Sequence, residues 1–440
     1  MNQNLIIPIH ALTYGDAGIG RSSDGKAIFV PETAPGDVVR VEIDQDSKRF
    51  ARAHVVEILE ESPYRVTPPC PDANICGSCP WIHINYETQL KAKRDNVVSS
   101  LQRIAHFDHE IAENLVEETI PSKRQLGYRN KLELATTTNK QGRFVVGMHA
   151  KGSKEIVPIK ECILAHKNIQ ATPKALQGAL RYLQGTQDLG IYRIGVRNSL
   201  RTNDTEIALW TKPGAFPRAA VAKTLQSALK TSSIVRVMAD PGKARKIKGV
   251  EVLAGKGMWH ERLFDQDFMI SAPSFFQVNT AQAETMIKCV IEGLELDKQS
   301  VVADLYSGAG TFSLTLAKHV DLVYAVESAA SSVRDLRRNA EANNTWVEVI
   351  GGDAARELPN LGHLDALVVD PPRAGLADSV SESIAEAGAK RVAYVSCNPT
   401  TWARDVVRLE ACGYRLIKVT PIDLFPQTYH GELVSIFQRN

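Results

Sequence analysis

The chain lacks any long hydrophobic run, since no stretch of about 18 uninterrupted apolar residues occurs in it. A membrane-spanning helix is therefore not expected, and the first residues lack the basic segment and apolar core of a signal peptide. Net charge is nearly absent too, at +2, which neither requires nor excludes nucleic acid because local patches matter more than the sum. The seven cysteines are an odd number, which argues against a disulfide framework. These absences predict a cytoplasmic protein that does not bind membranes.

The composition and length of the chain are those of a globular protein with more than one domain. Of the 440 residues, 44% are hydrophobic and 23% charged, without low-complexity tracts. Short apolar runs separated by turn signals predict a small β-barrel over residues 1–60. A proline-rich linker and a cysteine cluster open a mixed α/β central domain, predicted over residues 61–265. Within it, residues 86–104 predict a helix with Lys91, Lys93, Arg94 and Arg103 on its polar positions.

The third predicted domain, residues 266–440, contains apolar strands that alternate with helices, which predicts a doubly wound, largely parallel sheet. Its first strand ends in the turn "DLYSGAG" (304–310), where open sheets of this kind bind ligands. Ser313 replaces the third glycine of a nicotinamide fingerprint, so no pyrophosphate site is expected. Glu327, about 20 residues on, can accept hydrogen bonds from ribose hydroxyls, and Asp353 after the third strand can bind an adenine amino group. This set resembles the Rossmann-like S-adenosylmethionine-dependent methyltransferases.

Two more strand ends carry chemistry. Asp370 follows the fourth strand in "VVDPPRAG", and Cys397 follows the fifth in "YVSCNP", so both should face one crevice. Structural cysteines are more common inside a strand, so this position favours a reactive thiol. A thiolate that adds to carbon 6 of uracil makes carbon 5 nucleophilic toward a sulfonium methyl group, and a base must then remove the carbon 5 proton. We interpret Glu432 as that base and His430 as a supporting group.

Several stretches together identify a family. They are "YRNK" (128–131), "FFQVN" (275–279), "DLYSGAGTFSL" (304–314), "DPPRAG" (370–375), "SCNPTTWARD" (396–405) and "DLFPQTYHGE" (423–432). In their order and spacing the chain resembles the RNA 5-methyluridine (uracil-C5) methyltransferases. The resemblance implies Cys397 as nucleophile and Glu432 as base. It also implies contacts to S-adenosyl-L-methionine at Gln277, Tyr306, Thr311, Glu327, Asp353 and Asp370.

Two other functions are compatible with parts of this pattern. RNA 5-methylcytosine methyltransferases use the same thiolate addition but carry a second cysteine after the Asp-x-Pro of the fourth strand, where this chain has Arg373. A non-catalytic RNA-binding assembly factor would be expected to lose Cys397 or Glu432, and both are present. The sequence therefore favours uracil methylation.

A second group of cysteines suggests a metal site. Cys70, Cys76 and Cys79 cluster in "CPDANICGSCP", and Cys162 follows from far downstream. Four thiolates suit either zinc or an iron–sulfur cluster, and spacing alone leaves both open. The family that the chain resembles includes members with this cysteine pattern and a [4Fe–4S] cluster, which favours iron–sulfur over zinc.

The N-terminal barrel is similar to a TRAM domain, an OB-like barrel that binds RNA. Phosphate contacts are expected from its basic residues, and base stacking from Phe29 or Phe50. The basic residues are Arg21, Lys26, Lys48, Arg49 and Arg52. Barrel and cysteine cluster together resemble the members that modify 23S ribosomal RNA, with transfer RNA as the alternative substrate. The target uridine must be extruded into the crevice, and a monomer suffices for that.

Overall fold

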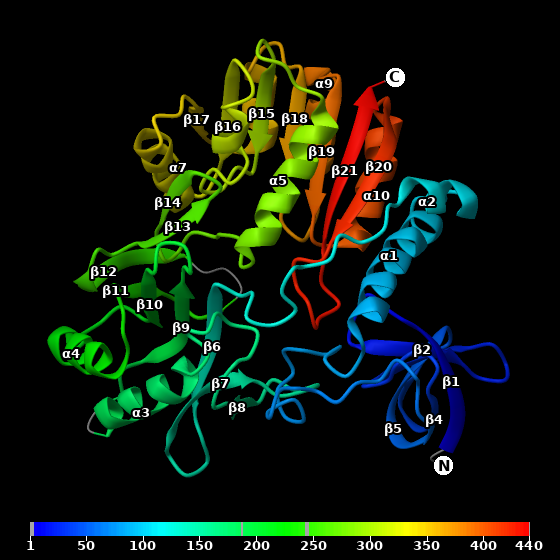
Figure 1. Ribbon diagram of the computed structural model, residues 1–440, viewed down its shortest axis with the longest axis vertical. Helices are drawn as coiled ribbons and strands as arrows, with labels where there is room; N and C mark the ends of the chain where they lie inside the picture. The colour runs from blue at the N-terminus through cyan, green and yellow to red at the C-terminus, as the bar shows by residue number, and fades with distance from the viewer. Residues whose placement is uncertain (1–3, 186–187, 243–245, 440) are drawn as a thin grey trace.

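The computed structural model describes residues 4–185, 188–242 and 246–439 (Figure 1). In this part of the chain the strands form a closed barrel, two seven-stranded sheets and one two-stranded sheet. Figure 1 shows the barrel and the first large sheet at one end of the molecule, and the C-terminal sheet at the other. None of the described helices is both long and apolar enough to cross a membrane.

The N-terminal barrel closes in the order β1-β2-β3-β5-β4. Its strands are β1 (Asn4–Leu12), β2 (Ala17–Arg21), β3 (Ala27–Pro31), β4 (Val38–Asp46) and β5 (Phe50–Glu60). Alternate residues such as Ile28 and Val30, or Val39 and Val41, are buried in its core, as the two-residue period of a strand requires. The predicted barrel is confirmed.

The central sheet is mostly antiparallel and is covered on one face by two helices. Its strands, in spatial order, are β12 (Ile247–Gly255), β11 (Ser233–Ala239), β10 (Thr205–Thr211), β9 (Ile191–Asn198), β6 (Lys131–Thr138), β7 (Phe144–His149) and β8 (Ile156–Pro158). Helices α3 (Thr172–Gln184) and α4 (Arg218–Ala228) bury Leu180 and Leu225 in the same core as the strand residues Val196 and Ile207. This core is separate from that of the C-terminal sheet.

The C-terminal sheet carries the predicted site. Its strands, in spatial order, are β17 (Glu348–Gly351), β16 (Leu322–Glu327), β15 (Val301–Leu305), β18 (Ala366–Val369), β19 (Arg391–Ser396), β21 (Glu432–Arg439) and β20 (Tyr414–Ile422). The first five are parallel and β21 runs antiparallel to β19, so the doubly wound, largely parallel sheet is confirmed. Because β21 is reversed, its first residue lies at the edge where the parallel strands end.

Helices cover both faces of this sheet (Figure 1). They are α5 (Thr280–Leu294), α6 (Ser313–Leu316), α7 (Ala330–Ala342), α8 (Ala354–Glu357), the 3-10 helix η1 (Leu358–Asn360), α9 (Asp378–Ala387) and α10 (Pro399–Ala411). The hairpin of β13 (Trp259–Leu263) and β14 (Gln266–Ile270) packs into the same core as α5.

Two helices that precede the central sheet in sequence also pack on the C-terminal sheet. Helix α1 (Tyr86–Arg103) and the short α2 (His109–Leu115) lie beside α10 and β20 (Figure 1). Leu101 of α1 shares a core with Trp402 of α10. The predicted position of Lys93 on the polar face of this helix is wrong, because its side chain is buried and ion-paired with Asp423.

Candidate active site

Cys397 and Glu432 meet at the carboxyl edge of the C-terminal sheet. Cys397 directly follows β19, and Glu432 is the first residue of β21. The antiparallel register pairs Ser396 with Leu433, so Cys397, which follows Ser396, lies opposite Glu432, which precedes Leu433. Strand pairing therefore fixes the thiol and the carboxyl group next to each other.

Both residues line one cavity of about 1090 Å³. The other predicted site residues that line it are Gln277, Tyr306, Glu327 and Asp370. Thr311 and Asp353 are not among the described residues that line it. Asp353 lies two residues beyond β17, is exposed, and accepts a hydrogen bond from the Ala355 amide as the N-cap of α8.

One end of the cavity carries polar groups that suit a nucleoside. Both carboxylate oxygens of Glu327 accept hydrogen bonds from main-chain amides, one from Gly308 N at 2.9 Å and the other from Ala329 N at 2.6 Å. These bonds fix the orientation of the carboxylate. Tyr306 and Gly308 have left-handed backbone, with φ of 64° and 57°, so the turn after β15 bends sharply under this carboxylate. The buried Gln277 Oε1 has no hydrogen-bond partner among the described residues. A buried acceptor of this kind is costly unless a ligand satisfies it.

The other end of the cavity holds the thiol in its neutral form. Burial, followed by the charge of Glu432, raises the pKa of Cys397 to about 11, although the Arg373 guanidinium acts in the opposite direction by its charge and by a hydrogen bond. Burial, followed by the charge of Asp370, raises the pKa of Glu432 well above 4.5. Burial also lowers the pKa of His430 to about 4. At neutral pH the resting site therefore carries a thiol and a neutral imidazole.

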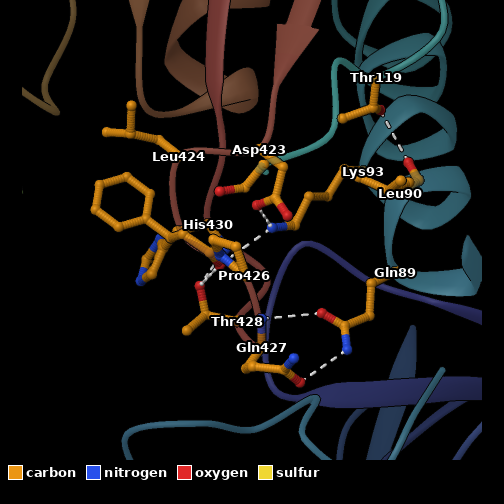
Figure 2. A network of polar contacts seen from close by, with 12 residues as sticks. Gln89, Leu90, Lys93, Thr119, Asp423, Leu424, Pro426, Gln427, Thr428 and His430 are labelled. Atoms are coloured by element: carbon orange, nitrogen blue, oxygen red, sulfur yellow. Dashed lines mark hydrogen bonds and ion pairs between the residues drawn. The ribbon is translucent and has the colours of Figure 1, made fainter. Parts of the chain in front are cut away.

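The loop that leads to Glu432 is held by helix α1 (Figure 2). The buried Lys93 ammonium ion-pairs with Asp423 and donates to the Phe425 carbonyl at 3.2 Å. Gln89 donates to Gln427 Oε1 at 3.1 Å and accepts from Gln427 N at 3.0 Å. These contacts join two segments more than 300 residues apart, and they fix the segment that carries His430.

Comparisons with known proteins agree with this geometry. A family model described as tRNA (Uracil-5-)-methyltransferase matches residues 85–359 and 357–440, and a TRAM domain model matches residues 4–56. The chain belongs to the tRNA (uracil-5-)-methyltransferase family. It is thus a member of an S-adenosylmethionine-dependent family of RNA methyltransferases, with a TRAM domain at its N-terminal end.

Relatives and one solved structure match over nearly the whole chain. An uncharacterized RNA methyltransferase of Gloeobacter violaceus is 36% identical, covering 100% of this chain and 97% of that protein. Another from Listeria monocytogenes is 34% identical, covering 100% and 98%. The crystal structure of Pyrococcus abyssi tRNA (uracil-54, C5)-methyltransferase in complex with S-adenosyl-L-homocysteine has a TM-score of 0.75 at 28% identity, covering 98% and 99%.

In this methyltransferase the four clustered cysteines come together. Cys70, Cys76, Cys79 and Cys162 line one small cavity of about 20 Å³, and each is a free thiol. Burial raises the pKa of the Cys70, Cys79 and Cys162 thiols. Among the residues that the structure describes, no group of three or more His, Cys, Asp or Glu side chains is arranged to hold a metal ion. The four predicted ligands therefore line one cavity, and their binding of a metal stays a prediction.

The basic residues predicted to contact phosphate on the TRAM barrel differ in their contacts and in their exposure. Lys26 is ion-paired with Asp46, and Arg21 donates to the Gly25 carbonyl at 2.9 Å. Lys48, Arg49 and Arg52 are exposed. The two candidate stacking residues, Phe29 and Phe50, contact each other edge to face with their ring centroids 5.7 Å apart.

Sequence reasoning missed two residues of this site. Arg373 lies beside Cys397, and its place in "DPPRAG" at a neighbouring strand end was the signal that could have revealed it. Tyr14, in the turn between β1 and β2 of the barrel, donates its hydroxyl to the Cys397 carbonyl at 2.7 Å. No sequence signal could have revealed this contact, because the two residues are 383 positions apart.

Proposed function

We propose that this protein methylates carbon 5 of a uridine in RNA, with 23S ribosomal RNA as the expected substrate and transfer RNA as the alternative. The observation that carries the proposal is the β19–β21 register, which sets Cys397 beside Glu432 at the edge of the cavity. The nucleophile and the base must reach adjacent atoms of one pyrimidine ring. This register brings both residues to the same point on the edge of the sheet.

In the proposed reaction the Cys397 thiolate forms a bond to carbon 6 of uracil, and the electron pair of the 5,6 double bond moves onto the ring as an enolate. S-adenosylmethionine would supply an electrophilic methyl group to carbon 5 of this enolate, with the methyl–sulfur bond broken and S-adenosylhomocysteine as the leaving group. The Glu432 carboxylate then removes the carbon 5 proton, the double bond re-forms, and the bond from carbon 6 to Cys397 breaks. The positive charge of Arg373 stabilises the thiolate both before it attacks carbon 6 and after it is released.

The residues that would hold the methyl donor lie at the nucleoside-like end of the cavity. Glu327 would accept from the ribose hydroxyls, and the unpartnered Gln277 Oε1 would accept from a polar donor. Tyr306 and Asp370 line the same space. Thr311 and Asp353 are proposed from the family resemblance, although neither is part of the cavity wall.

The choice between ribosomal RNA and transfer RNA rests on the similarity of this chain to other methyltransferases. The Pyrococcus abyssi relative acts on a uridine of tRNA, as its name states, which supports the alternative. The TRAM barrel combined with four gathered cysteines supports ribosomal RNA, through the resemblance to members that modify it. Arg373 stands where a cytosine methyltransferase would have its second cysteine, which disfavours 5-methylcytosine.

The test uses ribosomal and transfer RNA, each unmodified and tritiated at pyrimidine carbon 5, incubated with the protein and S-adenosylmethionine. Release of tritium with formation of 5-methyluridine from one RNA is the expected result and assigns the substrate. Cys397→Ala should abolish release, by at least about a thousandfold, whereas Cys412→Ala, at the end of α10, should not change it. Formation of 5-methylcytidine, or full activity of Cys397→Ala, would overturn the proposal.

We further propose that Cys70, Cys76, Cys79 and Cys162 hold a [4Fe–4S] cluster, with zinc as the less favoured occupant. Four free thiols around one cavity are the donor set that such a cluster requires. Protein purified without oxygen should contain four iron and four sulfide per chain. Cys162→Ser should lower the iron content, while the matched change Cys289→Ser on α5 should not. One zinc and no iron per chain would contradict this proposal.

A further inference from the structure

The turn between β1 and β2 of the TRAM barrel forms part of the wall of the active-site cavity. Gly15 and Asp16 line the cavity that contains Cys397 and Glu432. Tyr14, the residue before them, faces a separate void of about 20 Å³ that Glu432 also lines. This turn of the barrel therefore adjoins the proposed reacting groups, which is a separate contribution from binding RNA on the barrel surface.

Tyr14 contacts both segments that carry the reacting groups. Its hydroxyl donates to the main-chain carbonyl of Cys397 at 2.7 Å. Its ring packs edge to face against Tyr429 and His430, with centroids 5.5 and 6.3 Å away. Tyr14 therefore lies between the end of β19 and the loop that precedes Glu432.

In the segment that follows β19, the Cys397 carbonyl is the group that accepts a hydrogen bond from the barrel. On the following residue, the Asn398 amide donates to Ser396 Oγ at 3.2 Å, and the Asn398 side chain caps α10 by accepting from Thr400 N at 3.0 Å. Those contacts stay within the C-terminal domain. The bond from Tyr14 comes from a separate domain, so it forms only while the barrel is docked.

We propose that Tyr14 is a positioning residue, which orients the Cys397 peptide for attack and makes the reactivity of the thiol depend on docking of the TRAM barrel. The inference rests on the proposed function of Cys397 as nucleophile. Burial, with the neighbouring Cys397, raises the pKa of the Tyr14 phenol, so the hydroxyl keeps the proton that it donates.

The test compares full-length wild-type protein with Tyr14→Phe, which retains the ring and removes the hydroxyl. Tyr182→Phe is the control, because Tyr182 is 79% exposed on α3, away from the site. The probe is ribosomal or transfer RNA transcribed with 5-fluorouridine, whose carbon 5 fluorine blocks the final elimination and traps the adduct on Cys397. In single-turnover experiments with S-adenosylmethionine, Tyr14→Phe should form this adduct about three- to tenfold more slowly, with an unchanged Kd for the RNA.

A second measurement needs no RNA. Hydrogen exchange of the peptide that covers residues 394–400 should be faster in Tyr14→Phe than in wild type, and unchanged in Tyr182→Phe. Equal exchange, an equal rate of adduct formation, or a loss confined to RNA affinity would each overturn the inference. If wild-type protein forms no adduct with either RNA, the proposed function fails, and the positioning role in that reaction fails with it.

Discussion

Among single residues, the thiol and the carboxyl group of this site share one difficulty, since burial raises the pKa of both. The Cys397 pKa is raised to about 11, so the reactive thiolate is a small fraction of the protein at neutral pH. Arg373 acts against this effect by its charge. The proposed nucleophile therefore depends on the charge of a neighbouring cation.

The first prediction concerns the pH dependence of Cys397. Its folded-state pKa is raised, so the thiolate fraction should increase about tenfold per pH unit from pH 7 to about pH 10. The rate of alkylation by iodoacetamide, followed by mass spectrometry of the peptide that contains Cys397, should increase in parallel. Arg373→Met should lower this rate severalfold at pH 8, whereas Arg415→Met, at an exposed position of β20, should not. A plateau below pH 9 in the wild type would contradict the prediction.

The second prediction concerns Glu432. Glu432→Gln removes the group that accepts the carbon 5 proton, so kcat should fall by about a hundredfold or more. The covalent intermediate between Cys397 and methylated RNA should accumulate and appear as a slow-migrating band on a denaturing gel. The control is Glu410→Gln, which alters a carboxyl group on α10 outside the cavity. Normal turnover of Glu432→Gln without a trapped adduct would assign the base to another group.

At the scale of elements, helix α1 acts as a support for the loop that connects β20 to β21. Its buried Lys93 and the buried Asp423 form an ion pair across the base of this loop (Figure 2). Tyr86 also donates to Asp423 at 2.8 Å, so the carboxylate is held by two residues of one helix. A buried pair of this kind contributes little net stability, but loss of one partner is costly.

The third prediction follows from this pair. Lys93→Met leaves the Asp423 carboxylate buried without its cation, which should destabilise the fold by about 3–5 kcal/mol and lower the melting temperature. The double variant Lys93→Met with Asp423→Leu should recover most of that loss. Lys91→Met is the control, because Lys91, two residues before Lys93 on the same helix, forms an exposed ion pair with Asp95. Equal melting temperatures for Lys93→Met and Lys91→Met would show that the pair does not hold the loop.

At the scale of the whole molecule, three units surround the site and each contributes residues to it. The cavity wall includes Asp16 from the barrel and Arg129 from the segment leading into the central sheet, in addition to the C-terminal strand ends. A second cavity of about 1220 Å³ lies between barrel and central sheet and shares these two residues. An RNA held in the active site would therefore adjoin the barrel.

The fourth prediction concerns electrostatic binding of RNA by the barrel. Changing the exposed Lys48, Arg49 and Arg52 together to Ala should weaken RNA binding and lower the slope of log Kd against log salt by about two. The control is the triple variant of Lys167, Lys174 and Lys230, three exposed lysines outside the barrel. An equal change of slope in both variants would mean that the barrel has no special part in binding phosphate.

The C-terminal sheet and most of its strand-end residues could be predicted from local sequence patterns. Parallel strands end at one edge, so Cys397, Asp370 and Glu327 could be placed together from local patterns alone. The same argument does not give side-chain direction, and the N-cap contact of Asp353 with α8 could not be read from it. The predicted role of Asp353 in binding the cofactor stays a prediction.

How the other parts of the chain meet this edge depends on packing that is visible only in the folded protein. The burial of Lys93, the approach of Tyr14 to Cys397, and the register that pairs β21 with β19 depend on packing between segments far apart in sequence. Local propensity carries no record of such contacts, because the residue pattern that favours a helix, turn or strand is the same whichever segment packs against it. The chemistry of this protein could therefore be proposed from its motifs, whereas the residues that orient it appeared only once the domains were docked.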